Sequence, residues 1–363
     1  MINKLKNKRT LLIIAIIALL GFISIYYTLF NSKYAVGMFS DKIITGNFSE
    51  DESKSLNTFK KIDDFPVYTM NFYGDYGFSD YLKEGKKISE ELKSFYIADA
   101  VKDYNACSCV AALSDGEDKI FGRNLDYYYS PKLLLFTSPS DGYASVSMVD
   151  LRHVGFLTEE QLEEASSDDL KTLLYTPYLP FDGMNEYGLT VGEMTALGTK
   201  TSIDPNKVTL GDLTVIRLVL DRARTVDEAV DLLKNYNVYF PPAPPLHFMI
   251  SDRGGKSAVI EFIEGEMKII PNEEPWQVST NFLIYGSNDD TKNGCRRYTK
   301  AQKIVSEKEG KLSEKEMMML LKDISQRSTQ WSIVYNMDKG NINLSINRKY
   351  EDKDIKHFKL KMK

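Results

Sequence analysis

The sequence predicts an α+β fold in which β-sheets and helices are stacked as a layered sandwich. Three observations favour this class: strand and helix patterns occur in separate blocks, short turns join the strands, and the helical segments carry apolar residues on one face. The blocks run strands, helices, strands, helices, strands, which fits a helical bundle or a doubly wound parallel sheet less well. With 363 residues and 43% hydrophobic composition, the chain can bury a sizeable core.

The predicted strands are paired through turns. Residues 107–127, CSCVAALSDGEDKIFGRNLDY, place a turn between two apolar runs and predict a hairpin. Residues 246–271 predict a meander, with Gly254 and Gly255 supplying positive φ at one turn. Residues 331–350 return to the strand pattern at the end of the chain.

The predicted helices lie between these strands. Residues 212–223, DLTVIRLVLDRA, have apolar positions at three-to-four spacing, and Thr225 and Glu228 have the spacing of a capping box that opens a second helix. Residues 296–309 are helical by period and propensity, and Ser313 and Glu316 repeat the capping-box pattern before another helix.

An apolar run near the N-terminus predicts a transmembrane signal anchor. Residues 11–30 contain no charged side chain, and twenty residues at about 1.5 Å each cross a hydrocarbon core of about 30 Å. Lys4, Lys6, Lys8 and Arg9 precede the run, which places the N-terminus in the cytoplasm and the rest of the chain outside. The alternative is a cleaved signal peptide and a secreted protein.

Four regions are expected along the chain. Residues 1–30 form the basic tip and anchor, residues 31–64 form a polar linker, and residues 107–363 form the main domain. Between them, residues 65–106 form a pro-segment or covering hairpin, because residues 65–82 are dense in Tyr and Phe and interrupted by glycines.

Charge and short motifs exclude several functions. The formal net charge of −5 arises from 46 basic and 51 acidic side chains, so nucleic acid is not indicated as a partner. The segment RGGKS is not a phosphate loop, since Ile250 stands where that motif needs its first glycine. The segment CSC lacks a second Cys or His pair at zinc-ligand spacing, so neither a metal nor a cofactor is expected.

A cysteine nucleophile is the strongest chemical signal. The chain has three Cys, an odd number that favours at least one free thiol in an exported protein. A thiol needs a base, and the three histidines, His153, His247 and His357, have no recognisable catalytic context. Two interpretations remain open: a conventional Cys–His hydrolase using His247, or a Cys that uses its own α-amine as the base once it is the first residue of a mature chain.

The segment from Cys107 resembles the start of the choloylglycine hydrolase and penicillin V acylase family, where a mature N-terminal Cys is followed by a hairpin carrying G-R-N-x-D. Arg123 and Asp126 follow Cys107 by the 16 and 19 residues that the family shows. Later motifs come in the family's order: DGMNEYGLTVG at 182–192, LHFMISDRGGKSAVIEF at 246–262, STN ending at Asn281, and RRY at 296–298.

This resemblance implies an N-terminal-nucleophile hydrolase with an αββα four-layer sandwich of antiparallel sheets, preceded here by the transmembrane helix. It implies that Cys107 is the nucleophile and that Asp126 lies beside its thiol and amine. Arg123 would add positive charge, Asn281 would hold the amine or donate to the oxyanion, and Arg297 would brace the carboxylate network. Asn185 and Thr195 are candidates for substrate binding or the oxyanion.

The sequence also departs from the family. Thr195 stands where bile salt hydrolases carry an Asn, so the backbone N–H there is the alternative oxyanion donor. The 257 residues from Cys107 to Lys363 are fewer than in a bile salt hydrolase. The long preceding segment is similar to acid ceramidase and to acyl-coenzyme A:6-aminopenicillanate acyltransferases, which implies self-cleavage of the Ala106–Cys107 bond. Cys109 is a rival nucleophile, and Cys295 is expected to have no catalytic duty.

The resemblance therefore predicts hydrolysis of a linear, non-peptide C–N amide through a thioester acyl-enzyme, without a cofactor. The expected partners are a small amide with an apolar acyl group and, through residues 11–30, the cell membrane, with the catalytic domain outside the cytoplasm. A homo-oligomer is compatible with the sequence. The alternatives are an inactive membrane-anchored binding module of the same fold and an acyltransferase that uses the same acyl-enzyme.

Overall fold

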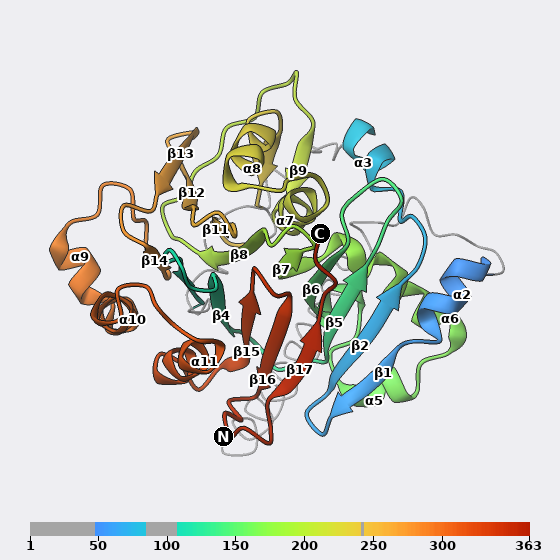
Figure 1. Ribbon diagram of the computed structural model, residues 1–363. Helices are drawn as coiled ribbons and strands as arrows, with labels where there is room; N and C mark the ends of the chain where they lie inside the picture. Colours follow the sequence, from blue (N-terminus) through green and yellow to red (C-terminus); the bar gives the residue numbers. More distant parts are fainter. Residues whose placement is uncertain (1–47, 85–106, 241–242) are drawn as a thin grey trace, which may run out of the picture.

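Two β-sheets form the centre of the molecule. The computed structural model describes residues 48–84, 107–240 and 243–363 (Figure 1). The nine strands of the first sheet are, in spatial order, β1 (Lys60–Asp63), β2 (Val67–Phe72), β5 (Lys132–Thr137), β6 (Ser145–Asp150), β7 (Pro180–Asn185), β8 (Thr190–Thr195), β11 (Leu246–Ser251), β12 (Ser257–Ile263) and β13 (Glu266–Pro271). The six strands of the second are β14 (Trp276–Ser279), β3 (Ser108–Ala112), β4 (Ile120–Asp126), β15 (Thr329–Asn336), β16 (Asn341–Ile346) and β17 (Lys356–Lys359). Strands β9 (Thr209–Gly211) and β10 (Asn237–Tyr239) pair separately.

Helices cover the outer faces of both sheets. The α-helices within the described ranges are α2 (Glu50–Leu56), α3 (Phe78–Glu84), α5 (Glu159–Glu163), α6 (Ser167–Leu170), α7 (Asp212–Arg222), α8 (Val226–Leu233), α9 (Asp289–Gly294), α10 (Arg296–Glu307) and α11 (Glu314–Asp323). Short 3-10 helices span Leu151–Val154 and Lys171–Tyr178. Helices α7 and α8 pack on the nine-stranded sheet, and α10 and α11 pack on the six-stranded sheet (Figure 1).

The largest apolar core lies between the two sheets. It contains Leu134 and Val146 from the first sheet and Phe121 and Ile333 from the second. Separate cores lie under α7 and α8 and under α10 and α11. The layer order is therefore helix, sheet, sheet, helix, and the predicted α+β sandwich is confirmed. The direction of one strand pair differs from the prediction of antiparallel sheets: β2 and β5 pair in parallel, within an otherwise antiparallel sheet.

The predicted hairpins and helices are present near their expected bounds. Strands β3 and β4 form the hairpin after Cys107, and β11, β12 and β13 form the meander. Ser313 and Glu316 form a complete capping box at α11. At α8 only half of the box forms, because Thr225 accepts from the Glu228 backbone while the Glu228 carboxylate accepts from the backbone N–H of Arg224.

The polar linker predicted for residues 31–64 is wrong for its described part. Helix α2 begins at a capping box made by Ser49 and Glu52, and its Ser55 is fully buried. Strand β1 then pairs with β2. The prediction interpreted the high charge of this segment as a sign of solvent exposure. Its acidic residues instead lie in the first turn of α2, where negative charge favours a helix.

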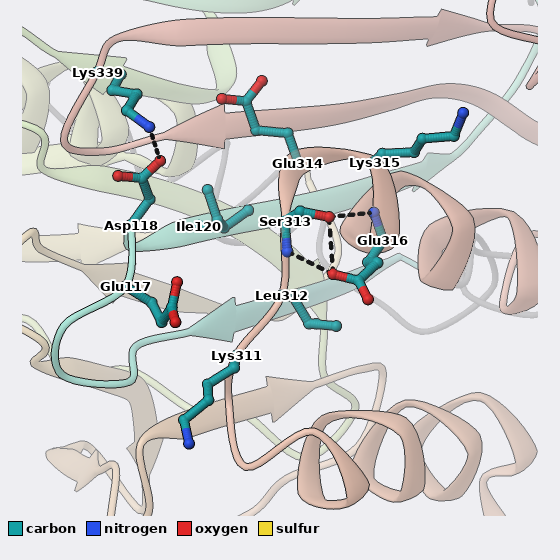
Figure 2. Close-up of a pocket in the computed structure, with 10 residues that line it drawn as sticks. All are labelled: Glu117, Asp118, Ile120, Lys311, Leu312, Ser313, Glu314, Lys315, Glu316 and Lys339. Atoms are coloured by element: carbon teal, nitrogen blue, oxygen red, sulfur yellow. Dashed lines mark hydrogen bonds and ion pairs between the residues drawn. The ribbon is translucent and has the colours of Figure 1, made fainter.

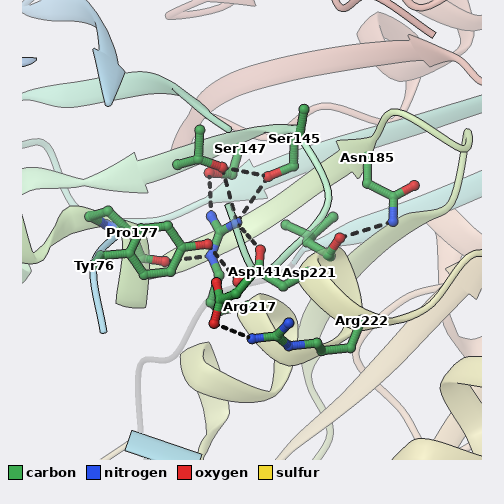
Figure 3. A network of polar contacts seen from close by, with 12 residues as sticks. Tyr76, Asp141, Ser145, Ser147, Pro177, Asn185, Arg217, Asp221 and Arg222 are labelled. Atoms are coloured by element: carbon green, nitrogen blue, oxygen red, sulfur yellow. Dashed lines mark hydrogen bonds and ion pairs between the residues drawn. The ribbon is translucent and has the colours of Figure 1, made fainter. Parts of the chain in front are cut away.

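The N-terminal segment is part of the fold and does not merely cover it. Strand β2 lies between β1 and β5, and its Val67 and Met70 have no exposed surface. Tyr76 donates a hydrogen bond to Asp221 Oδ2. Figure 3 shows the network beyond it, in which buried Arg217 of α7 donates to Asp221 Oδ1 (3.0 Å) and to Ser145 Oγ (2.9 Å).

The predicted anchor cannot be placed in this fold. Residues 11–30 lie outside the described ranges. No helix within residues 48–84, 107–240 and 243–363 is long and apolar enough to cross a membrane.

Candidate functional site

Cys107 lies at the start of β3, in the layer between the two sheets. In the β3–β4 ladder Ser108 pairs with Asn124, so Cys107 is next to the end of β4, where Asp126 lies. The Cys107 residue is only 5% exposed and Asp126 is fully buried. The hairpin turn predicted from the sequence thus returns the chain so that the thiol and the carboxylate, 19 residues apart, become neighbours.

Arg297 connects Cys107, Asp126 and Asn281. It lies in the first turn of α10, and its Nη1 donates to the Cys107 carbonyl (2.7 Å) and lies 3.6 Å from Asp126 Oδ2. Its Nη2 donates to Asn281 Oδ1 (2.9 Å). Four of the residues predicted from separate motifs therefore meet in one cluster.

Thr195 enters the cluster through its backbone. The Asn281 side chain donates from Nδ2 to the Thr195 carbonyl (2.9 Å), and Thr195 is the last residue of β8. An amide nitrogen carries two hydrogens, so this bond uses one donor of Asn281. The segment after β14 and the end of β8 are thereby fixed relative to each other.

Arg123 is held by a different set of groups. It is fully buried, ion-pairs with Asp182 (3.0 Å) and donates to the carbonyls of Glu193 (2.7 Å) and Phe181. Asp182 also accepts from Trp331 Nε1 (3.0 Å). The motif DGMNE contains Asp182, but nothing in its spacing showed that this carboxylate orients Arg123.

The thiol of Cys107 is held in its neutral form. Burial raises the pKa of Cys107, and the charge of Asp126 raises it further. The Arg123 guanidinium and the backbone N–H of Asp126 lower this pKa in part, but the net direction is upward. Thiolate formation at neutral pH therefore requires a base within the site.

Asp126 is fixed by donors that the sequence did not reveal. Gln326 Nε2 donates to its Oδ2 (2.7 Å), and the Thr329 hydroxyl donates to its Oδ1. Burial raises the pKa of Asp126 above its ordinary value, although these donors and Arg297 oppose the rise. Gln326 and Thr329 lie about two hundred residues from Asp126 in sequence, and no motif marks them.

Asn185 lies apart from this cluster. Its Nδ2 donates to the carbonyls of Leu220 (2.9 Å) and Ala223 (2.7 Å) at the end of α7, and its Oδ1 accepts from the turn that follows β7. Phe181, which contacts Arg123, is four residues earlier on the same strand, about 13 Å away at 3.3 Å per residue. The observed contacts of Asn185 are those of a turn and a helix end.

The structure also describes the other two cysteines and His247, the alternative base. Cys109 is fully buried, its thiol faces Gly192, and burial raises its pKa strongly. Cys295 Sγ lies 3.3 Å from Thr280 Oγ1, and all three cysteines are free. Both ring nitrogens of His247 are engaged by Glu261 and the Thr280 carbonyl, so its described contacts leave no nitrogen for a thiol.

A surface pocket lies at the opposite end of the β3–β4 hairpin. Figure 2 shows its lining, which is mostly charged and includes the Lys339–Asp118 ion pair. Its volume is about 510 Å³. The hairpin turn is one full strand length from Cys107, so this pocket does not contribute to the cluster. Over the described ranges, no group of three or more Cys, His, Asp or Glu is arranged for a metal ion.

Comparisons with known proteins identify the family. Residues 107–309 match the family model of linear amide C-N hydrolases, choloylglycine hydrolase family. An uncharacterized protein of Paramecium bursaria Chlorella virus 1 is 32% identical over 116 residues, which are 28% of this chain and 38% of that protein, so the chain spans well under half of that relative's length.

Two solved structures are similar to this chain. Conjugated bile acid hydrolase from Clostridium perfringens matches with a TM-score of 0.50 and 16% identity, over 70% of this chain and 92% of that one. Penicillin V acylase from Agrobacterium tumefaciens matches with a TM-score of 0.46 and 16% identity, over 66% of this chain and 83% of that one. At 16% identity, the similarity to the conjugated bile acid hydrolase shows the fold alone.

Proposed function

Because the chain belongs to the choloylglycine hydrolase family of linear amide C-N hydrolases, we propose that it hydrolyses a linear, non-peptide amide with Cys107 as the nucleophile. One observation carries the proposal: Arg297 joins Cys107 and Asn281 by hydrogen bonds and Asp126 by an ion pair, so the four residues lie in one cluster. Acyl transfer needs a nucleophile, a base and oriented donors at one place, and we assign the first two roles to the thiol and the α-amine of Cys107 and the third to the groups around them.

The base is the α-amine of Cys107, freed by scission of the Ala106–Cys107 bond. The upward pKa of the buried thiol means that a proton acceptor must lie beside it, and the described contacts of His247 leave it no free ring nitrogen. An α-amine with an ordinary pKa of about 7.7 to 8.0 suits proton transfer near neutral pH. Asp126 is the nearest carboxylate and would orient that amine.

The proposed reaction uses the thiol and the α-amine of Cys107. The thiol gives its proton to the amine, and the sulfur attacks the substrate carbonyl to form a tetrahedral intermediate. The amine returns the proton to the leaving nitrogen as the C–N bond breaks, which leaves a thioester on Cys107. Water, deprotonated by the same amine, hydrolyses the thioester and releases the acid.

Asn281 and the backbone of Thr195 are the proposed oxyanion donors. The Ala196 N–H donates to the Pro245 carbonyl across the β8–β11 ladder (2.9 Å), so alternate residues of β8 turn their backbone groups away from β11. Thr195 is such a residue, and its carbonyl accepts from Asn281. The N–H of Thr195 points to the same side of β8 as its carbonyl. This supports the Thr195 backbone N–H as the oxyanion donor where bile salt hydrolases carry an Asn.

The proposed substrate class rests on the family, and the proposed location of the catalytic domain rests on the sequence. We propose an amide with an apolar acyl group, presented to a catalytic domain outside the cytoplasm and anchored through residues 11–30. Fractionation of intact cells into membrane and soluble material, followed by protease treatment of the cell surface, tests this location.

Intact-mass analysis of wild type and Cys107→Ala tests the mechanism. We expect the wild type to give a new chain that begins at Cys107 and the variant to remain in one piece. A panel containing a conjugated bile acid, penicillin V, an N-acyl amino acid and a ceramide should yield free amine with wild type only, with kcat at least about 10³-fold lower in the variant. Turnover by a chain in which residue 106 is still bonded to Cys107 would rule the mechanism out.

A further inference from the structure

A buried pair of side chains lies behind the segment that carries Asn281. His247 on β11 and Glu261 on β12 have no exposed side-chain surface. His247 Nδ1 lies 2.9 Å from Glu261 Oε1, and Nε2 lies 2.7 Å from the carbonyl oxygen of Thr280. Thr280 immediately precedes Asn281, so the ring contacts the backbone of the candidate site from its buried side.

The proton positions follow from the partners. A carbonyl oxygen only accepts hydrogen bonds, so Nε2 must carry a hydrogen. Glu261 accepts backbone N–H groups from Ile284 (2.7 Å) and Tyr285 (2.9 Å), one at each oxygen, and its pKa is lowered despite burial, which together favour an ionised carboxylate. Nδ1 therefore also faces an acceptor. A neutral imidazole carries only one N–H, and only the doubly protonated ring satisfies both contacts.

The pair ties down the chain on both sides of Asn281. His247 holds Thr280 on one side, and Glu261 holds Ile284 and Tyr285 on the other. Between these points, Asn281 bonds to Arg297 and to the Thr195 carbonyl. The direction of the Asn281 side chain thus depends on the loop that the pair fixes.

We propose that His247 and Glu261 form an imidazolium–carboxylate pair that positions Asn281 for catalysis and does not act on the thiol of Cys107. The inference rests on the proposed hydrolase function. Its chemistry differs from that of a Cys–His hydrolase, where the imidazole must have a free nitrogen that faces the thiol.

Few other ionisable groups face the ring. From β12 the facing charge is Glu261, which is ionised because the favourable contacts with His247 and the two backbone N–H groups outweigh burial and lower its pKa. From β14, Ser279 Oγ lies 3.4 Å from Nε2. Cys295, the N-cap residue of α10, contacts Thr280 and not the ring. On β8, the residue that pairs with His247 is the uncharged Met194.

Two substitutions test the positioning role. In Glu261→Gln and in His247→Gln, the hydrogen bond between the two charged groups is lost and Asn281 is held less firmly, so kcat should fall about 10- to 100-fold while KM changes little. The alkylation rate of Cys107 by iodoacetamide should remain that of wild type. The control His357→Gln, at an exposed histidine, should retain wild-type kcat.

A second measurement does not depend on turnover. The sequence has three histidines, so ¹⁵N-histidine labelling of the full chain gives a simple NMR spectrum. Both ring nitrogens of His247 should show imidazolium signals in the folded protein at neutral pH, whereas a neutral ring would give one protonated and one unprotonated nitrogen.

Each result decides the proposal. A neutral His247 ring in the folded protein at neutral pH overturns it, as does wild-type kcat in both variants. Slower Cys107 alkylation in His247→Gln would instead assign the histidine as the base. If wild type hydrolyses no amide, the proposed function fails, while the NMR signals still decide whether the charged pair exists.

Discussion

At the scale of single residues, the site depends on a close approach that only glycine allows. Gly192 of β8 faces the layer between the sheets, where a Cβ would lie 3.0 Å from Cys109 Sγ and 3.1 Å from Arg123 Cδ. Both neighbours are fully buried. The third and last glycine of the DGMNEYGLTVG motif thus makes room for Arg123.

We predict that Gly192→Ala lowers the free energy of unfolding by about 1 to 3 kcal/mol, the usual range for overpacking a core. It should also reduce amide hydrolysis, because Arg123 moves relative to Cys107. Chemical denaturation and kcat measure the two effects. Gly294→Ala is the matched control, since a Cβ there meets nothing within 4 Å, and it should leave both values near wild type. A Gly192→Ala protein as stable as that control would contradict the crowding argument.

The motifs predicted the clustered residues but not the residues that hold them. Cys107, Asp126, Asn281 and Arg297 were each identified by spacing or by a short motif, and the structure brings them together. Their supports were not predicted, because Gln326 and Thr329 reach Asp126 only through the pairing of β15 with β4. Such contacts are a property of the sheet register and have no local sequence pattern.

At the scale of elements, local patterns located the helices α7, α8, α10 and α11 and the strands of the β3–β4 hairpin and the β11–β13 meander, but not which strands pair across the sheets. Alternation and turn residues predicted the β11–β13 meander, and the capping box at Ser313 predicted α11. The parallel pairing of β2 with β5 was not predicted, because it joins segments that are more than sixty residues apart. The charges of residues 48–64 suggested a solvated linker, whereas many of them cap α2 or form ion pairs.

Asp63 is one such charge, and it joins β1 to the C-terminal strands. Its carboxylate lies 3.0 Å from Lys349 Nζ and 3.1 Å from Lys356 Nζ, and its side chain is 7% exposed. Burial raises its pKa, but the two lysines and the Phe65 backbone N–H lower it more, so the net shift is downward from 3.8. The stabilisation from this lowered pKa is complete above the unfolded value near 3.8 and is lost as pH falls through the folded value.

We predict that Asp63→Asn destabilises the protein by about 1 kcal/mol at neutral pH and that the difference from wild type disappears in strong acid. Urea denaturation of both proteins at a series of pH values measures it. Asp231→Asn, which removes an exposed ion pair with Lys234, is the control and should change stability little at any pH. A constant difference down to the lowest pH would show that the charge of Asp63 is not responsible.

At the scale of the whole molecule, the N-terminal segment contributes to two cores of the domain after Cys107. Val67 and Met70 lie in the core between the sheets, and Phe78 lies in the core under α7 and α8. Tyr76 also joins the buried network of Arg217 and Asp221, which Figure 3 displays. Scission before Cys107 cuts the chain but removes none of these contacts.

We therefore predict that residues 48–84 remain bound after the proposed scission. Denaturing gels of mature protein should show two chains, and native mass spectrometry should show one complex that contains both. In Met70→Asp, an unpaired charge in the core costs more than about 3 kcal/mol, so the complex should separate or the precursor should fail to accumulate. Asn71→Asp places the same charge at the next, exposed position of β2 and should leave the complex intact. Recovery of an active chain that begins at Cys107 without its N-terminal partner would show that the shared cores are dispensable.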